Sequence, residues 1–231
     1  MMAVMRHSTL AVFFSLALSS SVAFAQPADS TESARLKQAV TIFNEIMSAE
    51  DKSIPRMILG KAEAIAIFPS TIKGGFVVGG MRGRGVISAR TASGWSAPAF
   101  MTLTGGSIGL QIGGQAADLI LVIMQRRGVE SLVRNQFKLG ADASVAAGPV
   151  GRDAQASTDL QLRAEILSYS RARGLFAGVT VNGSTLRADR DANERFYGKR
   201  LDTGQIVLMG QADTRAPVPE WIEVLDRYAR P

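Results

Sequence analysis

The sequence predicts an α+β fold: a strongly curled, mainly antiparallel β-sheet, barrel-like in its curvature, flanked by helices. The first observation is the stretch from Ile65 to Met124, where short runs of β-forming residues are interrupted by glycines. The second is the number of these glycines, because a glycine inside a strand marks a bend, a bulge or a close backbone approach. The third is the helical spacing of apolar residues outside this stretch.

The first 25 residues have the features of an export signal. A basic residue, Arg6, precedes an apolar core from Leu10 to Leu18, and Ala23-Phe24-Ala25 forms a small-residue cleavage pattern. A membrane anchor is the alternative, but the apolar core is shorter than the roughly 20 residues of a spanning helix. We expect cleavage after Ala25, a periplasmic or secreted protein, and a single domain over residues 26–231.

The composition excludes several kinds of chemistry. The chain has no cysteine, and its single histidine, His7, lies in the predicted signal. A mature protein without either residue has no disulfide, no cysteine nucleophile, no Ser-His-Asp relay and no ordinary zinc, haem or iron–sulfur site. We therefore expect no metal, no cofactor and no enzymatic activity.

The chain is mildly basic. The formal net charge is +6, and it becomes +5 when the signal is removed, because Arg6 is the only charged residue in it. This surplus favours anionic surfaces such as phospholipid headgroups, but ordinary solubility explains it equally well.

Two helices are predicted before the sheet. From Asp29 onward, Asp29 or Ser30 can cap a helix whose apolar residues recur with helical spacing. These residues are Leu36, Val40, Phe43 and Met47. A short second helix follows Ser53, with Pro55 in its first turn, and ends at Gly60. The sheet is expected to begin at Ile65.

Within the sheet we expect consecutive antiparallel strands, with a break at Ser93-Gly94. The predicted strands are Gly75–Val78, Val86–Ala89, Ala99–Leu103 and Leu119–Met124. A helix is predicted over Gly128–Phe137. The small side chains of Ala141–Ser157 indicate a strand or turn that passes close beneath other backbone, with a low-complexity linker as the alternative.

The last part of the chain returns to strands and then to helices. Strand character resumes over Glu165–Ser184, where Val179-Thr180-Val181 followed by Asn182-Gly183 predicts a tight hairpin. A short helix is expected over Asp189–Tyr197 and a last strand over Ile206–Met209. After Pro219, a C-terminal helix presents an apolar side. That side consists of Trp221, Ile222, Leu225 and Tyr228.

Two short motifs resemble catalytic ones but lack their partners. Gly105–Gly109 matches the G-x-S-x-G nucleophile elbow, but Ser107 has no histidine base, so a tight turn between strands is the better interpretation. Ser70–Lys73 matches S-x-x-K without the companion S-D-N and K-T-G segments. The paired glycines continue into neither phosphate-binding pattern, which argues against a nucleotide site and favours glycines that pack strands together.

Six segments, in order, resemble the SYLF family, also called Ysc84-like. They are AIAIFPSTIKGGFVVGGMRGRGV, GWSAPAF, GGSIGLQIGGQ, AAGPVGR, SYSRARGLFAGVTVNG and NERFYG, and the resemblance runs from about Ala34 to Gly210. Members of this family bind lipids, eukaryotic ones bind phosphoinositides through a basic amphipathic N-terminal segment, and some bind actin filaments. The resemblance implies a non-enzymatic lipid-binding protein associated with the membrane of the cell envelope. A protein–protein scaffold of the envelope is the alternative.

The resemblance also implies that an amphipathic N-terminal helix and a basic surface contact phospholipid headgroups or acyl chains. The basic residues of the N-terminal region are Arg35, Lys37, Lys52, Arg56 and Lys61, and a second basic set is Lys73, Arg82 and Arg84. Four acidic residues share the first region, namely Glu32, Glu45, Glu50 and Asp51, which disfavours strong binding of highly charged phosphoinositides. For any one of these basic residues, a solvated surface is the alternative. The expected partner is an anionic membrane surface or an envelope protein, and not nucleic acid.

Overall fold

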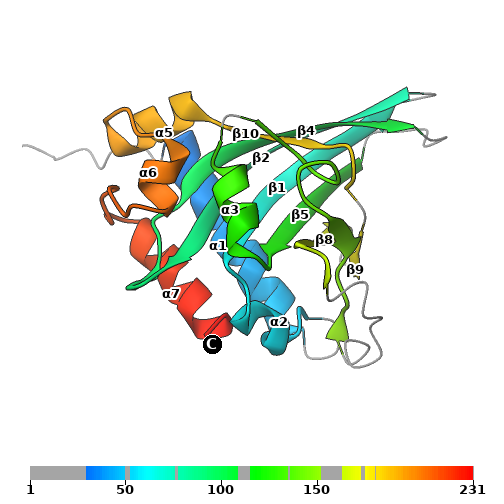
Figure 1. Cartoon of the computed structure of the whole chain (residues 1–231), viewed down its shortest axis with the longest axis horizontal. Helices are drawn as coiled ribbons and strands as arrows, with labels where there is room; N and C mark the ends of the chain where they lie inside the picture. Colours follow the sequence, from blue (N-terminus) through cyan, green and yellow to red (C-terminus); the bar gives the residue numbers. More distant parts are fainter. Residues whose placement is uncertain are drawn as a thin grey trace, which may run out of the picture.

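The computed structural model describes residues 30–49, 53–75, 78–108, 115–134, 136–151, 163–172, 175–179 and 181–230. A ten-stranded, strongly curled sheet forms the centre of this part of the chain (Figure 1). The predicted signal over residues 1–25 and the predicted site residue Lys52 lie outside the described residues.

The strands pair in the order β6-β10-β4-β2-β1-β5-β8-β7, while β3 pairs with β2 and β9 with β8. Only the pairing of β7 with β8 is parallel among these strands. The strands are β1 (Ala64–Gly75), β2 (Val78–Thr91), β3 (Gly94–Trp95), β4 (Ala99–Ile108), β5 (Gln115–Ile123), β6 (Gln136–Lys138), β7 (Val145–Ala147), β8 (Ile166–Ala172), β9 (Leu175–Gly178) and β10 (Thr185–Ala188). The predicted α+β class, with a mainly antiparallel and curled sheet, is confirmed as a half-barrel.

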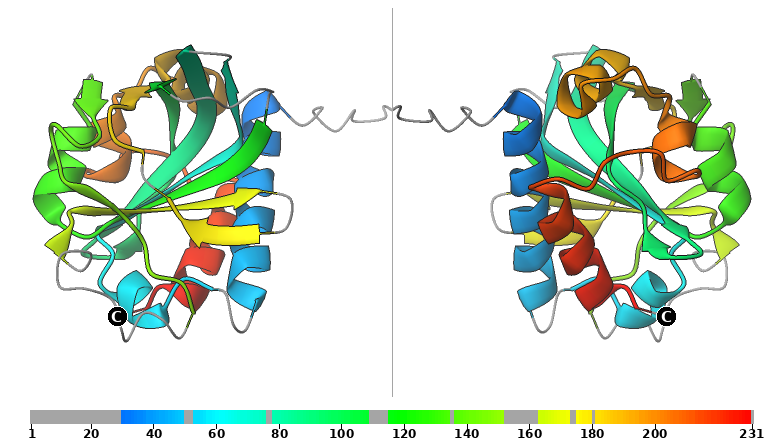
Figure 2. Two further views of the ribbon diagram at one scale, coloured as in Figure 1. Left: turned by 90° about the vertical axis from the view of Figure 1, so that its right-hand side faces the viewer. Right: turned by 90° about the vertical axis from the view of Figure 1, so that its left-hand side faces the viewer.

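The helices lie on both sides of the half-barrel. They are α1 (Thr31–Ser48), α2 (Arg56–Gly60), α3 (Arg126–Leu132), α5 (Arg190–Tyr197), α6 (Thr203–Val207) and α7 (Val218–Tyr228). Helix α1 lies on one face of the sheet and α3 on the other (Figures 1 and 2), and α1 packs beside α7 (Figure 2). The predictions of α1, α2, α5 and α7 are confirmed, and Ser30 is the residue that caps α1, through a bond from the Ser33 amide.

Glycines allow β1 and β2 to approach closely where the sheet bends. A Cβ atom on Gly85 would lie 2.2 Å from the Ile67 carbonyl oxygen, and one on Gly83 would lie 2.5 Å from Thr71 Oγ1. The register of β1 shifts in the same region, between Ile67 and Ile72. At these two positions the glycines therefore pack strands together, as predicted.

The small-residue stretch also runs against other backbone. It forms β7 and continues to Gly148, where a Cβ atom would lie 2.0 Å from the Tyr169 ring. A Cβ atom on Gly178 would lie 2.2 Å from the Gly148 carbonyl oxygen. The predicted close approach is confirmed here, while residues 152–157 lie outside the described part of the chain.

The predicted hairpin at Asn182-Gly183 is wrong, although the turn itself is present. Gly183 has a φ of 81°, which suits glycine, but β9 pairs with β8, and β10 pairs with β4 and β6. The Gly183 amide donates to Leu139 O at 2.8 Å, so the turn is joined to the β6 side of the sheet. Local turn residues set the chain reversal, whereas distant strands supply the partners.

Three other local predictions fail because of tertiary context. The helix expected to reach Phe137 ends at Leu132, and Phe137 is buried in β6. The strand expected over Ile206–Met209 is α6, whose start is held by a capping box formed by Asp202 and Gln205. Residues 105–108 lie within β4, paired with β2, and form neither the expected turn nor a nucleophile elbow.

The strand boundaries also differ from the expected ones. The sheet begins at Ala64, one residue before the predicted start, and β2 and β4 are longer than the runs that predicted them. The predicted strand Gly75–Val78 spans two residues that the structure does not describe. Long strands are possible here because the glycines between the apolar runs stay inside the ladder.

The apolar side of α1 belongs to the core. Leu36, Val40 and Phe43 are buried, and the Phe43 ring packs edge-on against Tyr228 of α7 at 5.9 Å between centroids. Trp221 of α7 is also buried, and its Nε1 donates to Ser88 Oγ of β2 at 2.8 Å. Helices α1 and α7 are therefore joined to each other and to the sheet.

Candidate functional site

A pocket of about 410 Å³ lies where the first half of α1 meets β1 and β2. The residues that line it are Thr31, Ala34, Arg35 and Gln38 of α1, Pro69, Ser70 and Ile72 of β1, and Arg82, Gly83 and Arg84 of β2. These described lining residues include three arginines and no carboxylate. We refer to this site as the basic pocket.

Strand β2 places two of the arginines on one face. Arg82 and Arg84 are two residues apart, so their side chains point to the same side of the sheet. Ile72 of β1 is directly opposite Arg82 in the strand register, and its side chain is 61% exposed. Two exposed cationic groups and an exposed apolar side chain therefore lie together beside α1.

A β-bulge in β1 shapes another wall of the basic pocket. The register between β1 and β5 shifts between Phe68 and Thr71, and Ser70 in this segment has a φ of 47°. The Ser70 amide donates to Asp118 Oδ1 at 3.0 Å, and its hydroxyl accepts from Gln38 Nε2 at 3.2 Å. These bonds hold an unfavourable backbone conformation in place and join the bulge to α1.

Arg35 is the buried member of the three arginines. Its side chain is 8% exposed, and its guanidinium lies 5.4 Å from the centre of the Phe100 ring. The nearest described carboxylate oxygen, Asp189 Oδ2, is 4.0 Å from Nη1, which is too far for a hydrogen bond. Nη1 has no hydrogen-bond partner within the described ranges.

Burial lowers the pKa of the Arg35 guanidinium, while Asp189 and Glu32 oppose this shift and Arg84 adds to it. An arginine keeps its charge even so, because its ordinary pKa lies far above neutral pH. The basic pocket therefore contains a buried positive charge that its protein surroundings neutralise only in part.

Of the four acidic residues that share the N-terminal region with the basic ones, the structure describes Glu32 and Glu45. Both form ion pairs. Glu32 accepts from Arg195 Nη2 at 2.7 Å. Glu45 pairs with Arg171, which also binds Asp118 Oδ2 at 2.8 Å. These carboxylates hold α1 to α5 and to the sheet, and their ion-pair partners, Arg195 and Arg171, are not lining residues of the basic pocket.

Three further predicted site residues, Lys37, Arg56 and Lys61, are not lining residues of the basic pocket. Lys37 is exposed on α1, and Arg56 and Lys61 are exposed on and just after α2. The Arg56 guanidinium lies 5.8 Å from the centre of the Tyr228 ring. Lys73 lies in β1, and its side chain is outside the description.

Sequence reasoning did not identify Gln38 and Ser70 as site residues. In the sequence, Ser70 stands out only as part of an S-x-x-K match, and nothing near it indicates a bond to Gln38, which lies 32 residues earlier in a helix. The departure from strand geometry at Ser70 becomes visible only when the bulge is seen.

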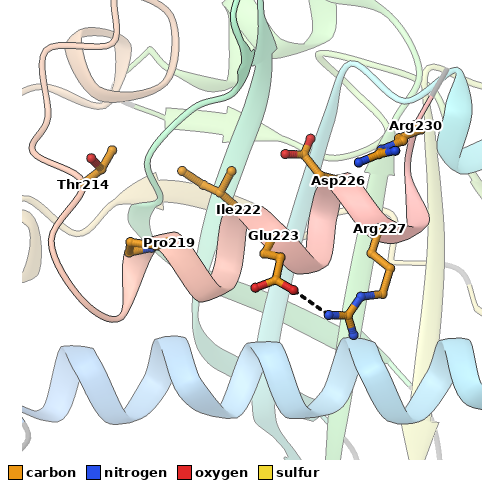
Figure 3. A pocket seen from close by; sticks show the side chains of 7 residues that line it. All are labelled: Thr214, Pro219, Ile222, Glu223, Asp226, Arg227 and Arg230. Atoms are coloured by element: carbon orange, nitrogen blue, oxygen red, sulfur yellow. Dashed lines mark hydrogen bonds and ion pairs between the residues drawn. The ribbon is translucent and has the colours of Figure 1, made fainter.

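A larger pocket, of about 610 Å³, lies along α7 (Figure 3). Glu223 and Arg227, one turn apart on α7, form an ion pair at 2.7 Å, and Asp226 and Arg230 line the pocket as well. Its two acidic and two basic side chains cancel in formal charge, so this pocket does not select an anionic ligand.

No group of three or more potential metal ligands occurs among the described residues. None of the described helices combines the length and apolar character needed to cross a bilayer.

Comparison with known proteins identifies the family. A model of the Ysc84 family, described as Las17-binding protein actin regulator, matches residues 104–228. The chain belongs to the Ysc84 family. Domains of this family, also called SYLF domains, associate with membranes and lipids and are generally not enzymes.

Several curated proteins are similar to this Ysc84-family chain. It is 34% identical over 209 residues to the human SH3 domain-containing YSC84-like protein 1, an alignment that covers 87% of this chain and 60% of the human protein. It is 33% identical over 190 residues to Protein YSC84 of Saccharomyces cerevisiae, covering 80% of this chain and 40% of the yeast protein. The chain thus spans about three fifths or less of these relatives.

Proposed function

We propose that this Ysc84-family chain is a non-enzymatic protein that binds phospholipid headgroups at an anionic membrane surface. The observation that carries the proposal is the convergence of Arg35, Arg82 and Arg84 on one pocket without an acidic lining residue among those described. The lipid binding of other domains in the family supports it.

The contacts available at this surface favour reversible attachment. A basic side chain near an anionic membrane contributes about 1 kcal/mol, so the two exposed arginines, Arg82 and Arg84, supply on the order of 2 kcal/mol. The exposed Ile72 side chain adds apolar contact beside Arg82. Because most of this attraction is electrostatic, added salt should weaken it.

In this proposal, α1 contributes Arg35 and its polar side rather than its apolar side. The amphipathic pattern of the helix suggests insertion of the apolar side among acyl chains, but Leu36, Val40 and Phe43 are buried in the fold. Exposing them to lipid would remove α1 from the core. We therefore assign membrane contact to headgroups rather than to acyl chains.

We further propose that the protein is exported and acts in the cell envelope, as the features of residues 1–25 predict. Mass spectrometry of the protein isolated from an envelope fraction should give a chain that begins at Gln26. An intact N-terminus in a soluble cell extract would contradict this assignment.

Vesicle co-sedimentation tests the proposed lipid binding. The mature protein, residues 26–231, should sediment with phosphatidylglycerol vesicles at low salt and much less with phosphatidylcholine vesicles. The double variant Arg82→Gln/Arg84→Gln should lose about tenfold or more in affinity, because it removes two of the three cationic groups.

The matched control is Arg134→Gln/Arg163→Gln, which removes the same charge from exposed positions outside the basic pocket. It should bind nearly as well as the unmodified protein. Equal losses in the two double variants would show that net charge alone matters. If no vesicles are bound but a stoichiometric protein partner is captured from an envelope extract, the scaffold function replaces the lipid-binding one.

A further inference from the structure

Arg35 Nη1 is a charged donor that has been removed from water without gaining a hydrogen-bond partner in the described part of the chain. Buried polar groups in folded proteins are nearly always paired, and an unpaired one often marks the position of a missing ligand or ion. Arg35 also lines the basic pocket, so a group that enters this pocket lies beside its side chain. Nη1 itself is closed to water, so a contact with it requires the side chain to shift. This atom distinguishes the basic pocket from a merely basic surface.

We propose that the basic pocket is a discrete site for one phosphate group, carried by a phosphomonoester or phosphodiester, with Arg35 and Arg84 as its principal ligands. This inference rests on the proposed function and specifies the part of the headgroup that is recognised. Arginine suits this role, because its planar guanidinium binds phosphate through two parallel charge-assisted hydrogen bonds.

The residues around Arg35 contact its guanidinium but leave Nη1 without a hydrogen bond among the described residues. Asp189, the nearest described acid, caps α5 by accepting from the Ala192 amide at 3.2 Å, and its other oxygen remains 4.0 Å from Arg35 Nη1. The Phe100 ring lies 5.4 Å from the guanidinium and offers it a cation–π contact, which is not a hydrogen bond. A side-chain shift that brings Nη1 to a phosphate oxygen in the basic pocket would therefore break no hydrogen bond to that atom.

The first turn of α1 strengthens the preference for an anion. Thr31, the first residue of this 18-residue helix, lines the basic pocket, and the N-terminal end of a helix carries a partial positive charge. Glu32, the acid of that turn, is engaged by Arg195. The positive end of α1, Arg35 from the same helix and Arg84 from β2 thus act on a single site.

The size of the basic pocket indicates a phosphate with an attached polar group. A volume of about 410 Å³ lies within the range of ordinary small-ligand pockets and exceeds what a bare phosphate occupies. Gln38 and Ser70 line the remaining space and can contact hydroxyl groups. The headgroup of a phosphatidylglycerol-like lipid and a free phosphorylated metabolite share this chemistry.

Amide NMR spectra of the mature protein provide the test, with inorganic phosphate, glycerol phosphate and phosphatidylglycerol vesicles as separate probes. Glycerol phosphate should produce saturable shifts at the amides of Gln38, Ser70 and Gly83. Arg84→Gln should weaken its affinity about tenfold, because one charge-assisted contact is lost. Arg84 is exposed, so this variant should fold normally.

A second variant separates the geometry of Arg35 from its charge. Arg35→Lys keeps the positive charge but loses the planar pair of donors, and it should weaken glycerol phosphate binding about as much as Arg84→Gln. Arg200→Gln, at a side chain that is 85% exposed, is the control and should leave affinity unchanged. If the soluble probes cause no saturable shifts, the phosphate site is refuted. It is also refuted if neither Arg84→Gln nor Arg35→Lys weakens the affinity for glycerol phosphate.

The vesicle probe separates this inference from the proposed function. Binding to phosphatidylglycerol vesicles without any response to soluble phosphates would refute the discrete site and leave membrane binding intact. Saturable binding of soluble phosphates without binding to vesicles would support the phosphate site and identify a free metabolite as its ligand, while refuting membrane binding.

Discussion

Two arginines that are held within the fold differ in how their donors are used. The guanidinium of Arg90 donates to the backbone carbonyls of Ala62, at 2.7 Å, and of Ala229, and lies 4.6 Å from the centre of the Trp95 ring. It holds the start of the sheet to the end of α7. Arg35 is more deeply buried than the half-buried Arg90, but its Nη1 has no such carbonyl in the described structure. The donors of Arg90 are therefore used within the fold, whereas Arg35 keeps an unpaired donor among the described residues.

The sequence alone could not separate these two residues. Arg35 was predicted as a lipid contact because it belongs to a basic amphipathic segment, and Lys37 was predicted on the same grounds. Only Arg35 reaches the basic pocket, because its position on α1 faces β2. Arg90 carried no signal at all, since its partners are backbone atoms, which any residue type could supply.

A buried tyrosine provides a residue-scale prediction about pH. Burial raises the pKa of the Tyr169 phenol above its usual value near 10, and its hydroxyl has no described hydrogen-bond partner. In the unfolded chain this phenol ionises above about pH 10, so its contribution to stability is complete below that pH and is lost above it.

Tyr169→Phe should therefore change stability little at neutral pH and reduce the loss of stability above about pH 10. Urea unfolding at several pH values measures both effects. The variant Tyr197→Phe is a useful contrast, because the Tyr197 hydroxyl donates to Pro98 O at 2.5 Å and its removal should destabilise the protein at neutral pH. Identical behaviour of the two variants would contradict this account.

At the scale of elements, the close packing of β1 against β2 depends on glycines. The curl of the sheet was predictable, because glycines inside β-forming runs require close approach. Which glycines meet which atoms was not predictable, because it depends on the register shift between Ile67 and Ile72. The same shift, together with that between Phe68 and Thr71, places Ser70 at the basic pocket.

Gly85→Ala tests this close packing of β1 against β2. The new methyl group would lie 2.2 Å from Ile67 O and 2.6 Å from the Phe68 ring, so strand movement should cost about 1–3 kcal/mol in the free energy of unfolding. Gly80→Ala in the same strand is the control, since its nearest neighbour would lie at 4.0 Å. Denaturant unfolding should show a clear difference, and equal stabilities would mean that the close approach does not shape the sheet.

Helix α1 provides a second test at this scale. Phe43 is fully buried against α7, so Phe43→Leu should lower the free energy of unfolding by about 1 kcal/mol or more. The folded variant should bind phosphatidylglycerol vesicles as well as the unmodified protein does, because Phe43 does not reach the surface. Thr41→Ala, at an exposed position of α1, is the control for both measurements.

The opposite pattern would be decisive for α1. If Phe43→Leu weakened vesicle binding while leaving stability unchanged, the apolar side of the helix would contact lipid. Helix α1 would then bind the membrane through its apolar side, and not through Arg35 and its polar side.

For the whole molecule, the half-barrel brings together residues that are far apart in the chain. Arg35, Ser70 and Arg84 come from three segments, and they meet because β2 and β1 are neighbours in the sheet and α1 crosses both. The sequence predicted the fold class, the flanking helices and the three arginines as separate candidates. It could not predict their meeting, because strand order and the bulge arise from long-range pairing.

The most direct test of the central claim is the salt dependence of binding to phosphatidylglycerol vesicles. Between about 0.1 M and 1 M salt, the Debye length falls from about 10 Å to about 3 Å. We predict that binding of the mature protein falls steeply over this range, and that the slope is clearly shallower for Arg82→Gln/Arg84→Gln. Binding that is independent of salt, or an unchanged slope in this double variant, would contradict attachment through the basic pocket.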